Sequence, residues 1–332
     1  MTGAGGALTG LARIILLELA MASRFERFGQ VELVHDARAI TGESPTWCER
    51  EQQLYWIDIE EPALHRFDPS TGGDQRWVMP CQIGAFALCR SGDILAALRL
   101  GLARISLFNR AFAALDAPPY NPLTHRFNEG KCDARGRFWV GAKFDPLPSA
   151  TAERHASALG PLTGAAPIHV LDYGEALRPA HASAVIANGM AWSLDNRVMY
   201  FADTPTRRVT AFDFDIESGA LSSPRVFAQF QGSDGKPDGA AIDREGFYWC
   251  ALYGGGRVVR IAPNGEIERE IRLPVSQPTM CAFGDADYRS LYVTSAAQGV
   301  SKQREPHAGG IFRCRPGIEG RPPHLFADDS RS

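Results

Sequence analysis

Glu43, Asn188 and Asp238 are the residues whose types and spacing are best suited to chemistry. Each side chain carries an oxygen, and each residue stands four places before an apolar residue that is followed by a turn. Two carboxylates and one amide oxygen form an all-oxygen set, which suits hard cations such as Ca²⁺, Mg²⁺ or Mn²⁺ better than zinc. Three protein ligands would leave coordination positions open for water or substrate, as a catalytic metal requires.

Each of these residues also has an ordinary structural interpretation. Asn188-Gly189 and Asp238-Gly239 are common turn dipeptides, and Glu43 taken alone would be a surface acid. The metal hypothesis depends on a single pattern, which is that all three residues fall at the same position of an internal repeat.

The repeat has six copies, two of them weaker than the rest. Its polar or small first positions are Glu43, Gly84, Asn128, Asn188, Asp238 and Thr279, and the anchors that follow are Trp47, Leu88, Cys132, Trp192, Ile242 and Phe283. Anchors at intervals of about 40 to 60 residues are typical of propeller blades, which are four-stranded sheets around a channel. The sequence therefore predicts an all-β, six-bladed β-propeller whose six first positions face one centre.

Short alternating strands separated by Gly, Pro, Asp and Asn turns fill the chain from Gln30 onward. The predicted strands cover residues 54–59, 63–68, 86–88, 94–98, 102–105, 137–141, 168–171, 198–203, 209–215, 247–251, 257–261, 290–294 and 310–314. Asp145 to Pro167 is interpreted as an insertion at the rim. Whether Val31 to Ala39 supplies the outer strand of the last blade is left open.

Composition limits the class of protein. The 332 residues include 45% hydrophobic residues, and the net charge of -3 with no Lys/Arg cluster argues against nucleic acid or an acidic membrane as a partner. Seven scattered cysteines without a CxxC pair indicate reduced thiols and a cytoplasmic protein. We expect a small-molecule ligand and a monomer or weak homo-oligomer.

The N-terminal residues 1–28 are set apart from the propeller domain, which we place at residues 29–328. Leu8 to Ala20 is apolar, but Arg13 and Glu18 interrupt it, and a second methionine follows at Met21. We interpret this extension as a start-site artefact or a disordered tail, with a secretion signal as the alternative.

Four motifs in this order resemble the senescence marker protein-30, gluconolactonase and luciferin-regenerating enzyme family. They are Gly42-Glu43-Ser44-Pro45, Arg126-Phe127-Asn128-Glu129-Gly130-Lys131, Asn188-Gly189-Met190-Ala191-Trp192-Ser193 and Pro237-Asp238-Gly239. The resemblance runs from about Gly42 to Gly310 and implies a six-bladed propeller that binds one divalent cation and opens sugar lactones. The cation expected is Ca²⁺, with Mg²⁺, Mn²⁺, Zn²⁺ or Fe²⁺ as alternatives.

The resemblance also implies roles for individual residues. Glu43, Asn188 and Asp238 match the family's metal ligands, while Arg126 and Asn128 match its substrate contacts. Lactone hydrolysis needs a water nucleophile and stabilisation of an oxyanion, and a divalent cation assists both. Asp238 is the candidate for ligand and general base, which makes it the catalytic residue. Arg126 would grip sugar hydroxyls or a carboxylate, or else form a salt bridge at the rim.

One departure from the family pattern concerns the sugar pocket. After Trp139-Val140-Gly141, many relatives carry Thr-Met and then an acidic residue, whereas this chain reads Ala142-Lys143-Phe144-Asp145-Pro146. Lys143 is a substrate-binding candidate that would favour an acidic lactone or replace another contact; a solvated lysine is the alternative.

The predicted activity is thus metal-dependent hydrolysis of the carboxylic ester of a sugar lactone. Two alternatives remain open: an aryl-ester or phosphotriester hydrolase on the same fold, and a non-catalytic calcium-binding propeller. The sequence contains no HExxH motif and no GxSxG elbow, so a zinc protease or a serine hydrolase is not indicated.

Overall fold

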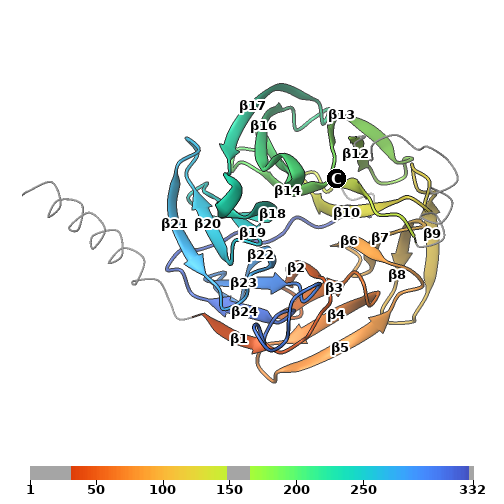
Figure 1. Ribbon diagram of the computed structural model, residues 1–332. Coiled ribbons are helices and arrows are strands. Elements are labelled where there is room, and N and C mark those ends of the chain that lie inside the picture. The colour runs from red at the N-terminus through yellow and green to blue at the C-terminus, as the bar shows by residue number, and fades with distance from the viewer. Residues whose placement is uncertain (1–30, 148–164, 329–332) are drawn as a thin grey trace, which may run out of the picture.

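Six four-stranded antiparallel sheets form a closed ring in the computed structural model, which describes residues 31–147 and 165–328 (Figure 1). The first three blades contain β2 (Gly42–Cys48), β3 (Gln53–Asp58), β4 (Ala63–Asp68) and β5 (Gly73–Val78); β6 (Ile83–Leu88), β7 (Ile94–Leu98), β8 (Gly101–Ile105) and β9 (Phe112–Asp116); and β10 (His125–Cys132), β11 (Phe138–Phe144), β12 (Ala166–Leu171) and β13 (Arg178–Ala184). The predicted six-bladed propeller is confirmed.

The remaining blades follow the same order from the channel outward. They contain β14 (Ala187–Trp192), β15 (Val198–Asp203), β16 (Arg208–Phe214) and β17 (Leu221–Gln229); β18 (Lys236–Ile242), β19 (Tyr248–Tyr253), β20 (Arg257–Ile261) and β21 (Ile267–Arg272); and β22 (Pro278–Gly284), β23 (Ser290–Ser295), β24 (Ile311–Cys314) and β1 (Glu32–His35). Two short 3₁₀ helices, η1 (Thr204–Thr206) and η2 (Gly232–Asp234), connect strands.

The ring closes because its first strand completes its last blade. Strand β1 pairs antiparallel with β24, with Leu33 opposite Phe312, so the stretch from Val31 to Ala39 does supply the outer strand that the sequence left open. The N-terminal extension lies outside the described residues, as does most of the insertion from Asp145 to Pro167. In the described part of the chain, no helix has the length and apolar character needed to cross a membrane.

Large aromatic side chains fill the spaces between neighbouring blades. Trp47 stacks on Tyr292 at a centroid distance of 5.8 Å, and Trp139 meets Trp192 edge-on at 6.0 Å. All six predicted anchors are buried. Burial of such rings is worth about 2 to 3 kcal/mol each, and it holds the blades at a constant separation.

The inner strands share a defect that matters for the site. In all six, the pairing with the second strand shifts at the repeat position: between Glu43 and Thr46, Ile83 and Ala85, Phe127 and Gly130, Asn188 and Ala191, Pro237 and Ala240, and Pro278 and Met280. A β-bulge bends its strand and re-aims a side chain. The repeat read from the sequence is therefore a repeated bulge at one end of the channel.

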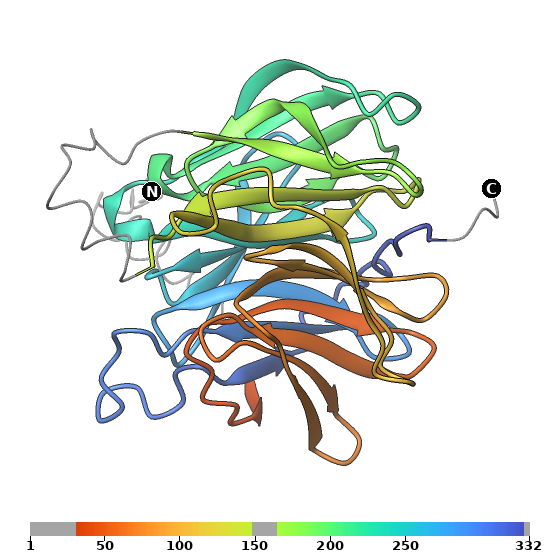
Figure 2. The same ribbon diagram turned by 90° about the vertical axis from the view of Figure 1, so that its right-hand side faces the viewer.

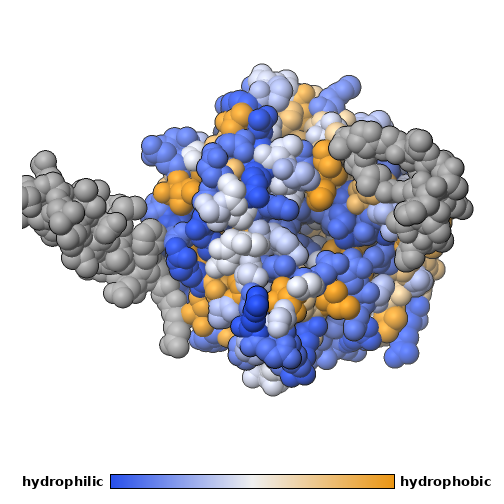
Figure 3. Space-filling model, viewed as in Figure 1, coloured by the Kyte–Doolittle hydropathy of each residue, from blue (hydrophilic) through white to orange (hydrophobic). Residues whose placement is uncertain are grey.

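The two faces of the ring differ. Figure 2 shows the C-terminal segment, in dark blue, on the side opposite to the loop between β23 and β24. Residues of this segment bridge to the ring, with Gly320 opposite Asp243 and Phe326 opposite Cys89. On the face viewed in Figure 1, hydrophilic side chains predominate and hydrophobic ones form separate patches (Figure 3).

Candidate functional site

Glu43, Asn188 and Asp238 occupy the bulges of β2, β14 and β18. Their exposed fractions are 8%, 5% and 7%, so all three polar side chains are buried although they lie on inner strands beside the channel. Strand β18 packs against β14 on one side and β22 on the other, and β22 packs against β2. Residues separated by nearly 200 positions in sequence thus belong to one end of one channel.

The two carboxylates act on each other electrostatically. Burial and the charge of Glu129 raise the pKa of Glu43 to about 8. Burial, followed by the charges of Glu43 and Glu129, raises the pKa of Asp238 well above its usual range. Glu43 accepts a hydrogen bond of 2.7 Å from the Ser44 backbone N–H, which offsets only part of this cost. A buried pair of like charges with so few donors is suited to a cation.

Asn188 is oriented by hydrogen bonds on both sides of its amide. Its Nδ2 donates to Thr204 Oγ1 at 2.8 Å, and its Oδ1 accepts from Asn128 Nδ2 at 2.9 Å. The Thr204 hydroxyl donates in turn to the Pro237 carbonyl at 2.7 Å, next to Asp238. One lone pair of Asn188 Oδ1 stays available for a metal. The sequence interpretation missed Thr204, which follows β15 and meets Asn188 only through strand pairing.

The bulges that carry Glu43 and Asn188 have unusual backbone conformations. Ser44 adopts a φ of 53°, which is strained for a residue with a side chain. Gly189 adopts a φ of 60°, and a Cβ at this position would lie 2.3 Å from the Tyr248 hydroxyl. Both the positive φ and the close approach of the Tyr248 hydroxyl require glycine at Gly189. Left-handed residues directly after Glu43 and Asn188 turn the strand locally at the candidate ligands.

Glu129 is a further buried acid that the sequence interpretation quoted in a motif but did not assign. Its carboxylate accepts hydrogen bonds from the backbone N–H groups of Gly189 and Met190, at 2.5 Å and 2.7 Å. Lys131, whose Nζ donates to the Ala240 carbonyl, supplies the opposite charge nearby. Burial raises the pKa of Glu129 to about 7 against this attraction. Glu129 therefore holds the bulge that presents Asn188.

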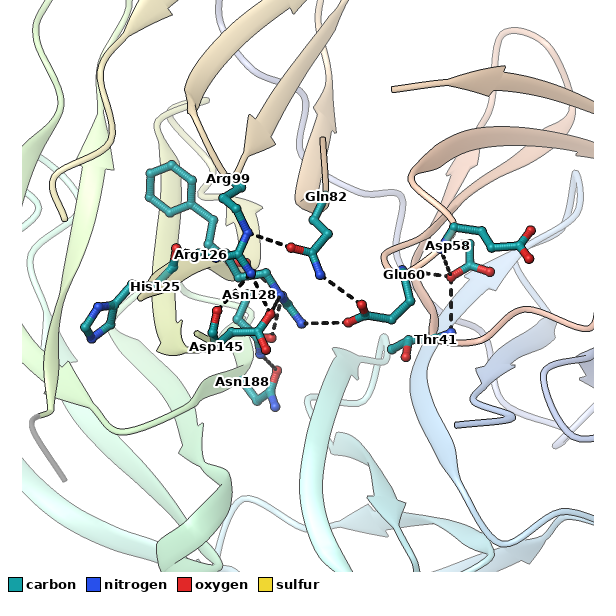
Figure 4. A network of polar contacts seen from close by, with 12 residues as sticks. Thr41, Asp58, Glu60, Gln82, Arg99, His125, Arg126, Asn128, Asp145 and Asn188 are labelled. Carbon is teal, nitrogen blue, oxygen red and sulfur yellow. Dashed lines mark hydrogen bonds and ion pairs between the residues drawn. The ribbon is translucent and has the colours of Figure 1, made fainter. Parts of the chain in front are cut away.

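Arg126 lies among polar groups of the protein, including Asp145, Asn128 and Glu60 (Figure 4). The residue is 1% exposed, and its Nε donates to Asp145 Oδ2 at 2.7 Å. A terminal nitrogen donates to Asn128 Oδ1 at 3.1 Å, and another lies 3.8 Å from Glu60 Oε1. The salt-bridge alternative considered for this residue therefore describes its contacts. Arg126 also fixes the direction of the Asn128 amide.

Asn128 connects this cationic group to the candidate metal ligands. Its Nδ2 donates to the Ala187 carbonyl at 3.0 Å as well as to Asn188 Oδ1. Both amide hydrogens are thus used within the protein. The arrangement places Asn128 beside the three-oxygen set, as a residue that orients Asn188.

Lys143 lies on β11 directly opposite Arg126 on β10. Burial, and then repulsion by Arg126, lowers the pKa of Lys143 to about 8, while Asp145, Glu60 and Asp238 act in the other direction. No hydrogen bond or ion pair to the Lys143 ammonium is found among residues 31–147 and 165–328. Its ammonium is close enough to Asp238 for the two charges to interact.

The two weaker repeat positions contribute no ligand. Gly84 has no side chain, and a Cβ there would lie 2.0 Å from the Phe127 carbonyl oxygen. The Thr279 hydroxyl donates to the Gly42 carbonyl and contacts the Thr294 hydroxyl. Within the described ranges, no cluster of three or more His, Cys, Asp or Glu residues suits a metal. Among the six repeat positions, Glu43 and Asp238 are the two acids, and Asn188 is the amide held by Thr204 and Asn128.

The other end of the channel is apolar. A cavity of about 120 Å³ lies there, lined by residues that include all six anchors and by the segment 321–324, and neither Glu43, Asn188 nor Asp238 lines it. The conformation of the inner strands thus separates a polar end, at the bulges, from an apolar end, four residues later along each strand.

Comparisons with known proteins agree with this architecture. A family model described as the SMP-30/gluconolactonase/LRE-like region matches residues 41–297. Regucalcin from Oryctolagus cuniculus is 34% identical over 303 residues, covering 90% of this chain and 98% of that protein. A 6-deoxy-6-sulfogluconolactonase from Pseudomonas putida is 34% identical over 300 residues, covering 87% of this chain and 96% of that protein.

Solved structures give the same result. The structure of regucalcin from Agrobacterium tumefaciens, described as a calcium-binding protein, superposes with a TM-score of 0.80 at 25% identity, covering 90% of this chain and 97% of that one. A luciferin-regenerating enzyme superposes with the same TM-score and identity, covering 90% and 99%. With the family model spanning most of the propeller, this chain belongs to the SMP-30/gluconolactonase/LRE-like family.

Proposed function

We propose that this protein is a divalent-metal-dependent lactonase that hydrolyses a sugar lactone to the free sugar acid. The observation that carries the proposal is the buried pair Glu43 and Asp238, two like charges at one end of the channel beside the oriented amide of Asn188. Buried carboxylates with so few donors are costly unless they bind a cation or perform chemistry. The 6-deoxy-6-sulfogluconolactonase relative is named for action on a lactone, which supports the same activity here.

Glu43, Asn188 and Asp238 would hold the cation, with Ca²⁺ expected first. Their two carboxylates and one amide offer only oxygen, the ligand type that Ca²⁺, Mg²⁺ and Mn²⁺ prefer. A divalent ion there would balance both buried negative charges. When bound, such an ion polarises the ester carbonyl and lowers the pKa of water. The calcium-binding regucalcin structure supports this choice of ion.

The remaining chemistry belongs to the protein's own side chains. We assign to the Asp238 carboxylate the role of general base, accepting the proton of the water that attacks the lactone carbonyl. Asn128 positions Asn188 through the 2.9 Å hydrogen bond, and Arg126 positions Asn128. The sugar would then contact Lys143 and the outer edge of this network, because Arg126 itself is buried.

A second candidate function is calcium binding without catalysis. The names of the regucalcin relatives favour it, since they refer to calcium rather than to hydrolysis. It predicts the same ligands but no role for Asp238 as a base. Hydrolysis of aryl esters or phosphotriesters on this site is the other enzymatic alternative.

The experiment that separates these functions is acid release from aldonolactones of five- and six-membered ring size, followed by pH-stat with Ca²⁺, Mn²⁺ or chelator. Metal-dependent acid release supports the lactonase. Ca²⁺ binding with no turnover of any lactone or ester would establish the non-catalytic function, and turnover of aryl esters alone would establish the other hydrolase. The variant Asp238→Asn tests the joint role of Asp238 as ligand and base, because it keeps the shape of the side chain but removes its negative charge and its proton acceptor.

A further inference from the structure

Lys143 is a half-buried cation on the polar end of the channel for which the described part of the chain provides no direct partner. It is paired across the strands with Arg126, a second cation. Like charges directly opposite each other on neighbouring strands destabilise a sheet. A sheet that keeps this arrangement beside its candidate metal ligands is expected to use the charge.

The acids near Lys143 already have other partners. Asp145 Oδ2 accepts from Arg126 Nε at 2.7 Å and from a terminal nitrogen of Arg99 at 2.9 Å. Glu60 accepts from Gln82 at 2.8 Å and lies 3.8 Å from Arg126 (Figure 4). Three positive side chains, Arg99, Arg126 and Lys143, thus face two negative ones, which leaves one positive charge in excess.

The carboxylates of the candidate metal site do not neutralise this excess positive charge. A divalent cation would balance Glu43 and Asp238, and Lys131 balances Glu129 deeper in the channel. Once the metal site is filled, the Lys143 ammonium has no directly bonded counterion among residues 31–147 and 165–328. A partly desolvated, unpaired charge is unfavourable, so a ligand that brings an anion to this place gains more than a neutral one.

We propose that Lys143 is a specificity-determining residue and that the substrate is an acidic lactone, which carries a carboxylate or sulfonate group away from the ester that is opened. This inference rests on the proposed lactonase activity and names its substrate class. The ester is placed at Glu43, Asn188 and Asp238, and the anionic group of the sugar lies against the Lys143 ammonium. Arg126, held behind Lys143 by Asp145, adds to the positive potential there.

The test compares kcat/KM for three lactones of one sugar chain in the metal-loaded protein: neutral gluconolactone, a glucarolactone with a terminal carboxylate, and a terminally sulfonated gluconolactone. The wild-type protein is expected to prefer at least one of the anionic lactones by at least about 10-fold. In Lys143→Met, the ratio of anionic to neutral kcat/KM should fall about 10- to 100-fold, the range expected for one charge-assisted hydrogen bond. Lys143→Arg, which keeps the charge, should retain most of the preference.

Lys302→Met is the matched control. Lys302 is exposed in the loop between β23 and β24, so its loss removes an equal charge at a residue to which no role in the site is assigned. This variant should leave all three rates unchanged. A wild-type preference for neutral gluconolactone, or an unchanged ratio in Lys143→Met, would overturn the acidic substrate while leaving the lactonase intact. No hydrolysis of any lactone would instead overturn the proposed activity. The two anionic probes separate a carboxylate from a sulfonate substrate.

Discussion

Two buried aspartates, Asp238 near the start of β18 and Asp243 just after its end, differ in the hydrogen-bond donors around their carboxylates. Asp243, in the turn after the strand, accepts hydrogen bonds from the backbone N–H groups of Glu245 and Phe247, from Trp249 Nε1 at 2.8 Å and from Arg260 Nε at 2.7 Å. Asp238, five residues earlier, lies instead where the charges of Glu43 and Glu129 raise its pKa. The Gly239 N–H and the charge of Lys143 act to lower its pKa, but burial and the neighbouring acids outweigh them.

The same contrast recurs around the ring. Asp133 follows β10 as Asp243 follows β18, and it accepts from Trp139 Nε1 at 2.8 Å and from Arg137 Nε at 2.7 Å. Acids at the apolar end are therefore fully satisfied and structural. Glu43 and Asp238, in two of the bulges at the polar end, have fewer hydrogen-bond donors than Asp133 and Asp243, which is the pattern expected of groups kept for a ligand or a reaction.

Asp238→Asn should have the largest effect on activity. Loss of the general base and of one metal ligand is expected to lower kcat/KM for a lactone by about 1,000-fold. The melting temperature in chelator should stay the same or rise, because one of two like buried charges is removed. Lactone turnover measures the change in kcat/KM, and thermal melting in chelator measures the change in melting temperature. Full activity in this variant would refute the double role of Asp238.

Asp243→Asn should lower stability and leave metal binding and activity nearly unchanged. It leaves Arg260 and the Trp249 indole without their best acceptor, and we expect a loss of about 3 kcal/mol in the free energy of unfolding. Metal affinity and kcat per folded molecule should stay near the wild-type values. Urea unfolding measures the first quantity, and metal titration of the folded variant measures the second. If Asp243→Asn impaired metal binding as much as Asp238→Asn, the two ends would not be functionally separate.

Glu129→Gln should lower the metal affinity of the polar end without removing a candidate ligand. A glutamine offers only one acceptor oxygen to the two N–H groups of Gly189 and Met190, and it leaves Lys131 without its counterion. The bulge that presents Asn188 should loosen and lower metal affinity about 10- to 100-fold, as for other residues that orient metal ligands. Calorimetric titration with Ca²⁺ measures this, with the exposed Glu175→Gln as control. Equal affinities in both variants would show that Glu129 does not position Asn188.

The smallest effect concerns the pH dependence of stability. In chelator, the pKa of Glu43 is raised from 4.5 to about 8, so its contribution to stability is present below pH 4.5 and is lost as the pH rises through about 8. A bound cation favours the ionised carboxylates and removes this loss. The gap in melting temperature between the metal-loaded and chelated protein should therefore widen from about pH 5 to about pH 8. A gap that is constant or narrows would contradict a site made of these carboxylates.

Much of the fold could be predicted because its signals are local. The strands at Ala63–Asp68, Ile94–Leu98, Val198–Asp203 and Arg257–Ile261 have the predicted boundaries, and each combines apolar residues with flanking turns. The inner strand β6 begins earlier than predicted. Ile83 opens β6 three residues before the predicted start, because the bulge interrupts the alternation on which the prediction depends.

The contacts of the candidate site were less predictable. Thr204 reaches Asn188 only because β15 pairs with β14, and the burial of Arg126 follows from Asp145 and Glu60 on other strands and turns. That the described residues provide Lys143 with no direct partner depends on Asp145 being engaged by two arginines. Such competition for one carboxylate is a property of the three-dimensional arrangement, and no spacing in the sequence encodes it.

The central claim is that Glu43, Asn188 and Asp238 bind one divalent cation together. A crystal soaked in Mn²⁺ and measured at the manganese edge tests it most directly. We predict one anomalous peak per chain within about 2.0 to 2.6 Å of an oxygen of each of the three side chains, and no such peak in Asp238→Asn. A wild-type map with no peak between them at saturating Mn²⁺, or with the strongest peak elsewhere, would contradict the account.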